Sequence, residues 1–434
     1  MSNKGKENLE HPAGKKPLAP KLRFPEFHKT GGWKSLPIGA IYSFMATNSF
    51  PRGELSHDTG GVKNIHYGDI HTRFAASFDI LRERVPCISS SKLAEGRGAG
   101  DPCAEGDMVF SDASEDREGV GKSVEIVRLN GERVVAGSHT ILARQRTPRL
   151  VVGFGAHLFR SPLVRGRIQT ESQGAKVFGI SPGRLARVEI PLPPEISEQK
   201  KIADCLSSLD DLIAAEAQKL DALKSHKKAL MQQLFPRESE AVPRLRFPEF
   251  RKAGEWERRR VGDVFSVTRG EVLPMGSVRD AQTTATPYPV FSSKTENGGL
   301  AGFYSEYLYE DAITWTTDGA NAGDVNFRRG KFYCTNVCGV LATQSGYANP
   351  CTAALIGRTS RRHVSYVGNP KLMNGAVERM VVPFPALPEQ KKIADCLSSL
   401  DDLIAAESQK FDALKSHKKA LMQQLFPSPD EVPA

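Results

Sequence analysis

"EQKKIADCLSSLDDLIAAEAQKLDALKSHKKALMQQLFP", residues 198–236, occurs twice in this chain of 434 residues. The second copy, residues 389–427, differs only in having Ser408 for Ala217 and Phe411 for Leu220. The residues between the two copies show no comparable likeness to those before the first copy. The repeated stretch is therefore the element around which we expect the fold to be organised.

The repeated stretch has the pattern of a coiled-coil helix, because its apolar residues recur at alternating spacings of four and three. Glu216 and Lys227 interrupt this seam in the first copy, as Glu407 and Lys418 do in the second. An antiparallel pair in which Glu216 faces Lys418, and Lys227 faces Glu407, turns both interruptions into opposite-charge layers. A parallel pair would face like charges. The predicted seam comprises Leu209, Ile213, Glu216, Leu220, Leu223, Lys227, Leu230, Leu234, Leu400, Ile404, Glu407, Phe411, Leu414, Lys418, Leu421 and Leu425.

The alternative interpretation is that these are ordinary amphipathic helices, each packed on its own body, because an apolar stripe on a helix usually faces a local core.

A second repeat precedes each body. "KLRFPEFHKTGGW" begins at Lys21 and "RLRFPEFRKAGEW" at Arg244. The predicted organisation is a disordered polar tail (1–20), a first body (21–197), a central helix (198–236), a linker arm with a second body (237–388), a C-terminal helix (389–427) and a tail (428–434). Because the chain opens with the segment that would follow its last helix, its two ends could meet and close a pseudo-twofold ring.

The bodies contain strand-like pieces such as "KSVEIVRL" and "DAITWTT", separated by turn clusters of Gly, Asn and Asp. Regular helical periodicity is scarce between the repeats. The predicted fold class is therefore α+β: two mixed bodies rich in strands and loops, separated by two long helices that form an antiparallel coiled coil.

The formal charge of +9 favours a polyanionic partner such as nucleic acid. Each body has a stretch without Asp or Glu, residues 133–170 and 325–377, in which arginine is frequent. Arginine suits this role because its planar fork can hold a phosphate or bridge O6 and N7 of guanine. The candidate DNA-binding residues are Lys122, Arg133, His139, Arg144, Arg146, Arg149, Ser292, Ser293, Lys294, Asn297, Thr317, Asn326, Arg328, Arg329, Arg361 and Arg362.

Motifs for catalysis are weak. "DREGVGKS", residues 116–123, resembles a phosphate-binding loop, but Asp116 stands where that loop needs glycine and would repel phosphate. Cys334 and Cys338 form a single C-x3-C without a second pair, so we predict no metal site and expect the seven cysteines to be reduced thiols. No apolar run reaches the length of a membrane helix, and we expect a cytoplasmic protein.

The order "LRFPEF…W", variable body, "IPLPPEISEQKKIADCLSSLDDLI", followed by "LRFPEF…W", variable body, "VPFPALPEQKKIADCLSSLDDLI", resembles the DNA specificity subunit of type I restriction-modification enzymes. "YGDI" at Tyr67, "GDMVFS" at Gly106, and "YPVFSS" at Tyr288 with "GDVNFRRGKF" at Gly323 look like pieces of its recognition domains. The likeness covers nearly the whole chain.

This resemblance implies two target-recognition domains that read the two halves of a bipartite site in double-stranded DNA, with the helices setting the unspecified gap. It also implies two modification (methyltransferase) subunits that use S-adenosylmethionine, and restriction (translocase and endonuclease) subunits that use ATP and Mg²⁺. No cofactor would be bound by this chain, which would be non-catalytic.

Two other functions stay open from the residues alone. One is a coiled-coil assembly scaffold whose bodies bind DNA without sequence preference, and the other is a nucleotide hydrolase built on "GVGKS". Binding that discriminates between duplexes separates the first from the specificity subunit, since phosphate contacts carry no sequence information.

Overall fold

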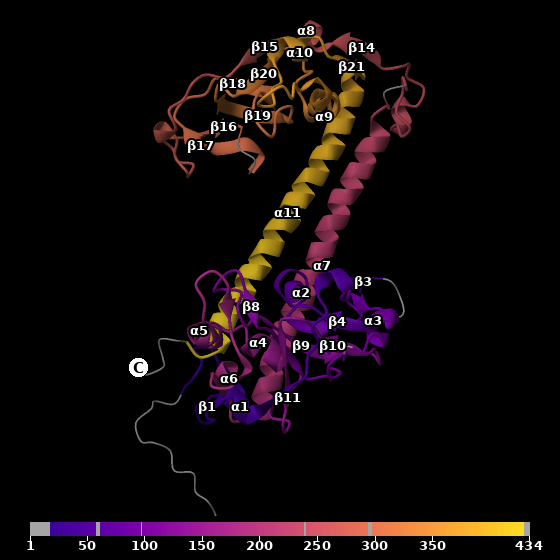
Figure 1. Ribbon diagram of the computed structural model, residues 1–434. Coiled ribbons are helices and arrows are strands. Elements are labelled where there is room, and N and C mark those ends of the chain that lie inside the picture. The colour runs from indigo at the N-terminus through magenta and orange to yellow at the C-terminus, as the bar shows by residue number, and fades with distance from the viewer. Residues whose placement is uncertain (1–17, 58–60, 97, 238–239, 294–296, 429–434) are drawn as a thin grey trace, which may run out of the picture. The chain divides into compact units, whose positions relative to one another are not determined.

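The computed structural model describes residues 18–57, 61–96, 98–237, 240–293 and 297–428 (Figure 1). The chain forms two compact units: unit 1 comprises residues 1–216 and 410–434, and unit 2 comprises residues 217–409. Each unit therefore contains one body together with parts of both long helices.

Both bodies are built on the same two-stranded ribbon. In unit 1, β1 (Lys34–Pro37) pairs antiparallel with β13 (Glu189–Leu192), and in unit 2, β14 (Glu257–Arg260) pairs antiparallel with β21 (Val381–Phe384). One helical turn follows the first strand of each ribbon, α1 (Ile38–Ile41) or α8 (Val261–Val264). The ribbon joins the beginning of each body to the residues just before its long helix.

A glycine occupies the same place in each of these helical turns, six residues after the tryptophan that ends the repeated arm motif. The amide of Gly39 donates to the carbonyl of Ala186 at 2.9 Å, and a Cβ on Gly39 would lie 3.0 Å from the Cβ of Ala186. At Gly262, the equivalent position, a Cβ would lie 3.3 Å from Glu378. Glycine recurs there because the backbone passes close to the segment that precedes β13 or β21.

The central sheets of the two bodies share one topology, although their sequences are unlike. In unit 1 the strand order is β2 (Tyr42–Met45), β11 (Thr140–Gln145), β7 (Met108–Ser111), β9 (Ser123–Arg128), β5 (Ser77–Asp79). In unit 2 it is β15 (Ser266–Arg269), β20 (Cys338–Ala342), β18 (Tyr309–Thr316), β19 (Val325–Cys334), β16 (Tyr288–Phe291), extended by β17 (Leu300–Tyr304). Neighbouring strands are antiparallel except for β5 with β9 and β16 with β19, which are parallel in both units.

Further elements complete the bodies and confirm the predicted α+β class. Unit 1 adds a four-stranded sheet in the order β10 (Val134–Ala136), β4 (Val62–Ile65), β6 (Cys87–Ile88), β3 (Leu55–Ser56), and a ribbon of β12 (Phe178–Gly179) with β8 (Ala113–Ser114). Its short helices are α2 (Tyr67–Thr72), α3 (Ser90–Ala94), α4 (Phe154–Leu158), α5 (Pro162–Glu171) and α6 (Pro182–Leu185). Unit 2 has α9 (Pro350–Ser360) and α10 (Asn374–Glu378). Turns of 3-10 helix lie at Pro25–Phe27, Arg52–Glu54, Pro248–Phe250, Met275–Ser277, Asn297–Gly299 and Arg361–His363.

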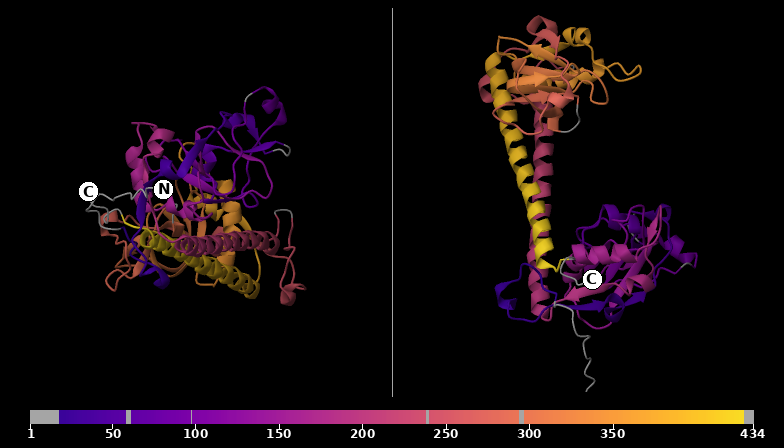
Figure 2. Two further views of the ribbon diagram at one scale, coloured as in Figure 1. Left: turned by 90° about the horizontal axis from the view of Figure 1, so that it is seen from below. Right: turned by 90° about the vertical axis from the view of Figure 1, so that its left-hand side faces the viewer.

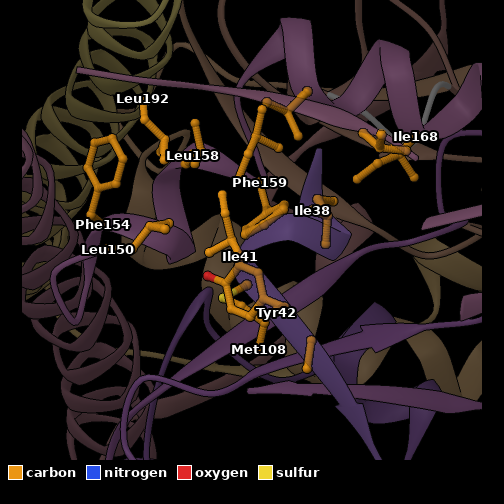
Figure 3. Packing of buried hydrophobic residues seen from close by; sticks show 14 of the residues in the cluster. Ile38, Ile41, Tyr42, Met108, Leu150, Phe154, Leu158, Phe159, Ile168 and Leu192 are labelled. Atoms are coloured by element: carbon orange, nitrogen blue, oxygen red, sulfur yellow. The ribbon is translucent and has the colours of Figure 1, made fainter. Parts of the chain in front are cut away.

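The core of unit 1 joins its body to both long helices. Ile38, Tyr42, Met108 and Phe159, labelled in Figure 3, belong to one buried cluster and are almost completely buried. The same cluster includes residues of the long helices, Ile202, Leu206, Leu425 and Phe426. Unit 2 repeats the arrangement, with Leu234, Phe235, Ile393 and Leu397 in its core. Burial of this apolar surface is the main stabilisation of each unit.

The two predicted long helices are confirmed as α7 (Ile196–Leu234) and α11 (Leu387–Leu425). In each unit a segment of one helix lies beside a segment of the other (Figures 1 and 2). All sixteen predicted seam residues are buried or half-buried, whereas outward positions such as Lys224 and Lys415 are exposed. The helices run antiparallel, because residues early in α7 pair with residues late in α11.

The predicted register of this pair is wrong by about one heptad. Glu216 pairs with Lys410 at 2.7 Å rather than with Lys418, and Lys418 pairs with Asp210. In unit 2, Glu407 pairs with Lys219. Lys227 there pairs with Asp401 rather than with Glu407. Each pair in unit 1 thus has its equivalent in unit 2 under the repeat.

The physical reason for the shift is that a heptad pattern matches itself again after a slide of seven residues. The apolar seam therefore fits both registers, and the charges alone cannot choose, because Asp210 and Asp401 can replace the seam glutamates as partners of Lys418 and Lys227. The choice is made at the helix ends, where Phe235 and Phe426 are each about 1 % exposed within a body core.

The arm segments fasten each helix end to its body. The amide of Leu22 donates to the carbonyl of Gln424 at 2.9 Å, and the amide of Leu245 donates to the carbonyl of Gln233 at 3.0 Å. The first arm therefore contacts the end of α11 in the same way as the second arm contacts the end of α7. This contact brings the described ends of the chain together, as the sequence predicts.

The described residues contain no helix that is both long enough and apolar enough to span a membrane. Cysteines in the described part of the chain are free thiols, five buried and two, Cys205 and Cys396, half-buried on the long helices. Over the same residues, no group of His, Cys, Asp or Glu side chains is arranged to hold a metal ion.

Candidate nucleic-acid interface

Unit 2 has a groove of about 420 Å³ where the ends of β18 and β19 meet the C-terminal part of α9. Four of the candidate DNA-binding residues line it: Ser292, Asn326, Arg328 and Arg361. Arg358, from the same acid-free stretch, also lines the groove, as do the polar residues Thr316 and Asp324. The amide of Thr352 donates to the side chain of Asn349, which caps α9 and fixes the helix that carries these arginines.

Arg328 is held in place by three contacts within the body. Its Nε donates to Thr314 Oγ1 at 2.9 Å, its Nη2 donates to the carbonyl of Gly298 at 2.7 Å, and its guanidinium lies 3.7 Å from the ring centre of Phe291. Burial lowers the pKa of Arg328 to about 10, so the side chain stays charged at neutral pH. This arginine supplies a fixed positive charge at the floor of the groove.

The two arginines of the groove wall differ in how firmly they are held. Arg358 Nη1 donates to the carbonyl of Met231 at 3.1 Å, and its guanidinium lies over Phe235. Burial, with the nearby Arg362, lowers the pKa of Arg358. Arg361 is 71 % exposed and pairs with Asp324 at 2.7 Å. Because a partly exposed pair is weak, Arg361 is the side chain that can exchange its carboxylate for a phosphate or a base edge.

Unit 1 has a groove of about 340 Å³ at the equivalent place, where the start of β9 meets the segment from α4 to α5. Lys122 is the candidate residue that lines it, together with His71, Arg73, Arg160 and Arg165. Both grooves therefore lie at the same edge of the shared sheet and both are rich in cations. The residues that line them are unlike, as expected for surfaces that contact different partners or different sequences.

The arginines of the unit 1 groove are anchored on the backbone. Arg165 Nη2 donates to the carbonyls of Glu118 and Val120, both at 2.7 Å, and Arg160 Nη2 donates to the carbonyl of Ser123 at 3.5 Å. Burial lowers the pKa of Arg165 to about 10 and also lowers the pKa of Arg160. Arg165 stays charged at neutral pH, and both guanidinium groups line the groove.

An aromatic cluster adjoins the unit 1 groove. The ring of Tyr67 lies 5.3 Å from that of His139, 4.7 Å from that of His66 and 6.1 Å from that of His71. His71 Nε2 lies 2.9 Å from Ser111 Oγ and 3.1 Å from the carbonyl of Ala113. Of this set, only His139 is among the candidate DNA-binding residues. The "YGDI" motif was the signal that could have added Tyr67 and His71.

Two candidate DNA-binding residues lie outside the grooves and bond to groups within their own body. Arg144 donates through Nε and Nη2 to Asp107, which is almost completely buried, so it is an internal ion pair. Thr317 is completely buried and bonds to Asp318 and the carbonyl of Val337. Both side chains are thus engaged within the body, although the Arg144 side chain is still 33 % exposed, and their contact with DNA stays a prediction. The sequence could not reveal this, because burial depends on the sheet that encloses them.

The remaining candidates are surface residues that the structure does not bring into either groove. Arg133, Arg146, Arg149, Arg329 and Arg362 are exposed, and Ser293 is half-buried. His139 Nδ1 lies 3.3 Å from Asp112 Oδ1. Lys294 lies outside the described residues, and only the backbone of Asn297 is described.

The loop of residues 116–123 lacks the surroundings of a nucleotide site. It leads into strand β9 rather than into a helix, and the amide of Gly119 donates to the carboxylate of Asp116. That amide is therefore not available to a phosphate. A phosphate-binding loop instead needs free amides at the N-terminus of a helix.

The fold and its grooves define a class of protein: a duplicated chain with two bodies of one topology, each presenting a basic groove, and each joined to an antiparallel pair of repeated helices. A family model described as the type I restriction modification DNA specificity domain matches residues 125–225 and 253–416. The chain belongs to this family.

Individual relatives agree with this assignment. A Mycoplasma pneumoniae protein named as type I specificity subunit S.MpnORF285P is 31 % identical over 152 residues, which is 34 % of this chain and 49 % of that protein. The match thus spans about half the length of that relative. A crystal structure of a type I restriction-modification S subunit from M. genitalium has a TM-score of 0.65 at 15 % identity, covering 95 % of this chain and 100 % of the other.

A second solved structure, reported for complex assembly and conformational transition of the type I restriction-modification system, has a TM-score of 0.51 at 15 % identity. It covers 91 % of this chain and 98 % of the other. At this identity both structures show the fold, and both confirm the predicted architecture.

Proposed function

We propose that this chain is the non-catalytic specificity subunit of a type I restriction-modification enzyme, and that each body reads one half of a bipartite site in double-stranded DNA. The observation that carries the proposal is the pair of basic grooves, formed by unlike residues at the same edge of a shared sheet. A common scaffold with different lining residues is what two recognition surfaces for different half-sites require.

The groove residues suit DNA in both charge and hydrogen bonding. Arg328 and Arg358 are fixed cations that can neutralise phosphates, and the exposed guanidinium of Arg361 can do the same when it leaves Asp324. The amide of Asn326 can bond a base edge. In unit 1, Lys122, Arg160 and His71 offer the same mixture. Salt-dependent affinity follows, because each neutralised phosphate releases a counterion.

The partners of this subunit follow from the family assignment and are part of the proposal. Two modification subunits would supply S-adenosylmethionine-dependent methylation of adenine, and restriction subunits would supply ATP- and Mg²⁺-dependent translocation and cleavage. The exposed faces of α7 and α11 are the repeated surface, so they are the natural place for two identical partners. The paired helices would set the number of unspecified base pairs between the half-sites. A chain with this role acts on DNA in the cytoplasm.

The test is to map methylated adenines in host DNA with the natural subunit and with a chimera in which residues 28–197 come from a relative of different specificity. We expect one half of the methylated motif to change and the other half to persist. A motif that changes in both halves, or in neither, would contradict the proposal.

A scaffold with sequence-independent DNA binding is the second candidate, favoured only by the net charge of the chain. Competition binding separates the two: a specificity subunit prefers the duplex that carries the mapped motif, whereas a scaffold binds all duplexes of equal length alike.

A further inference from the structure

Both bodies carry the same short hairpin just before the ribbon strand that leads into a long helix. In unit 1, Gln173 and Gly179 exchange backbone hydrogen bonds at 2.9 and 2.7 Å. In unit 2, Ser365 and Lys371 do the same at 2.8 and 2.9 Å. We refer to residues 173–179 and 365–371 as the first and second tip hairpins. Their sequences, "QGAKVFG" and "SYVGNPK", are unlike, so the shared element is their geometry.

Equivalent bonds fasten each tip hairpin to the end of the central sheet. The amide of Ile180 donates to the carbonyl of Asp112, just after β7, and the amide of Leu372 donates to the carbonyl of Thr317, just after β18, both at 2.8 Å. In unit 1, β12 of the hairpin also pairs with β8. The hairpins therefore occupy the same place in two bodies whose sequences are otherwise unlike.

The tips expose apolar side chains. In the second hairpin Tyr366 is 70 % and Val367 is 93 % exposed, and Val367 has the highest exposure among the large apolar residues of the described chain. In the first hairpin Val177 is 60 % exposed. A single exposed valine needs no explanation, but apolar tips on both equivalent hairpins do.

The second tip hairpin lies beside the groove of unit 2. Arg361, at the start of the turn that leads into the hairpin, lines the groove. The Val364 side chain packs close to Gly323, another lining residue, because a Cβ built on Gly323 would lie only 3.0 Å from it. In unit 1 the connection runs through Ala113, which belongs to β8 and whose carbonyl lies 3.1 Å from the groove residue His71. Each apolar tip is thus next to a basic groove.

The surroundings of the second tip favour DNA over a protein partner. Residues 361–372 contain Arg361, Arg362, His363 and Lys371 and no acidic residue; the carboxylates that neighbouring segments bring to them are Asp324, which pairs with Arg361, and Asp318, 3.8 Å from Lys371. A protein-docking surface usually exposes a contiguous apolar patch of several hundred square ångströms, which two side chains do not provide. One or two apolar side chains within a basic surface are instead the pattern of a wedge that enters the minor groove and unstacks a base step.

We propose that Tyr366 and Val367 form an apolar wedge that inserts between base steps of the DNA held by the unit 2 groove, and that Val177 is its counterpart on the first body. This inference rests on the proposed function. The wedge would add a source of sequence specificity that needs no hydrogen bond to a base. The energy needed to unstack two neighbouring base pairs depends on which bases they contain. Pyrimidine–purine steps next to the contacted bases would be favoured, since they unstack most easily.

The experiment uses the full-length chain and duplexes that carry the methylated motif mapped for the natural enzyme, with 2-aminopurine placed at successive positions along the site. The test variants are Tyr366→Ser combined with Val367→Ser, and separately Val177→Ser. The matched control is Leu81→Ser, because Leu81 is an apolar side chain with a similar exposure of 61 %. Leu81 also lies away from the unit 1 groove: it follows β5, whose last residue pairs with Arg128 at the end of β9, whereas the groove is at the start of β9.

The natural chain should raise 2-aminopurine fluorescence at one step in each half-site. The double variant should abolish the signal in one half-site and weaken binding about tenfold, because the wedge contact is lost while the bases stay stacked. Val177→Ser should abolish the signal in the other half-site. Leu81→Ser should leave both signals unchanged, and thermal unfolding of all variants should stay at the natural value because the side chains are exposed.

Two results would overturn the wedge. One is a natural chain that prefers its motif but shows no fluorescence change at any step. The other is a double variant that binds the motif as tightly as Leu81→Ser does. A natural chain without any preference for the motif would instead refute the proposed function.

Discussion

Arg23 donates two hydrogen bonds to the buried carboxylate of Glu198, from Nε at 2.7 Å and from Nη2 at 2.6 Å. This pair fastens the "LRFPEF" arm to the first turns of α7, and Trp33 Nε1 adds a third donor to Glu198 at 3.2 Å. Arg246 and Glu389 repeat the pair in unit 2. The arm motif and the helix therefore recur together because one supplies the cation and the other the anion.

Arg23→Ala should lower the free energy of unfolding by about 3–5 kcal/mol, because it leaves Glu198, which is completely buried, without its charge partner. Denaturant unfolding measures the loss, and Arg246→Ala is the matched variant in unit 2. Arg23→Lys should recover only part of it, since an ammonium cannot make the two-pronged contact. A loss below about 1 kcal/mol would show that the pair is no stronger than a surface ion pair.

Charge reversal at Glu216 distinguishes the observed helix register from the one that the seam charges predict. Glu216→Lys should lower the melting temperature, because Glu216 is 4 % exposed and Lys410 then faces a like charge. Adding Lys410→Glu should restore part of the stability, whereas adding Lys418→Glu should not. Rescue by Lys418→Glu in place of Lys410→Glu would contradict the structure.

His157 should make stability depend on pH below neutrality. Burial lowers the pKa of His157 to about 3, and its Nε2 lies 3.2 Å from Ser207 Oγ on α7. The unfolded chain binds a proton near pH 6.5 while the folded chain does not, so the contribution is complete above pH 6.5 and falls as the pH drops toward 3. At pH 5.5 the loss is about 1 kcal/mol.

The check is denaturant unfolding at pH 7.5 and pH 5.5 for the natural chain and for His157→Gln, which keeps a hydrogen-bonding side chain but does not titrate. The pH-dependent loss should shrink by about 1 kcal/mol in His157→Gln. If both chains lose the same stability between pH 7.5 and pH 5.5, groups other than His157 cause the pH dependence.

Replacing Arg361 should affect only DNA binding, whereas replacing Arg328 should also affect the stability of the fold. Arg361→Ala should weaken DNA binding and lower its salt dependence by about one phosphate contact, with little change in melting temperature, because the side chain is exposed. Arg328→Ala should also lower the melting temperature, because Thr314, Gly298 and Phe291 lose a shared partner. Salt-titrated binding and calorimetry of both variants measure the two effects. Equal melting temperatures would show that Arg328 is not a structural residue.

Local patterns were sufficient to predict the parts of the fold that depend on near neighbours in the sequence. The 4,3 spacing from Leu209 to Leu234 predicts a long helix, and its second copy predicts an antiparallel partner, since the interruptions Glu216 and Lys227 have opposite charge. The arm repeats at Lys21 and Arg244 predict that the two bodies begin alike. Both expectations agree with α7, α11 and the two ribbons.

The candidate site was predicted only at the level of regions. The acid-free stretches do contribute Arg160, Arg165, Arg328, Arg358 and Arg361 to the grooves. Within these stretches the sequence cannot tell Arg361, which is exposed, from Arg144, which is paired with the buried Asp107. The difference arises from β7 and β11, which place Arg144 next to Asp107 although the two are far apart in the chain.

The sequence by itself determined the repeated plan: two arms, two bodies of mixed strands, and two nearly identical helices that pair head to tail. These features follow from spacing and charge along the chain. Only the tertiary structure decided the helix register, the common sheet of two unlike bodies, and the place of each groove and tip hairpin. A heptad seam is equally satisfied one repeat away, so the register is set by Phe235 and Phe426, whose burial in the body cores no local pattern encodes.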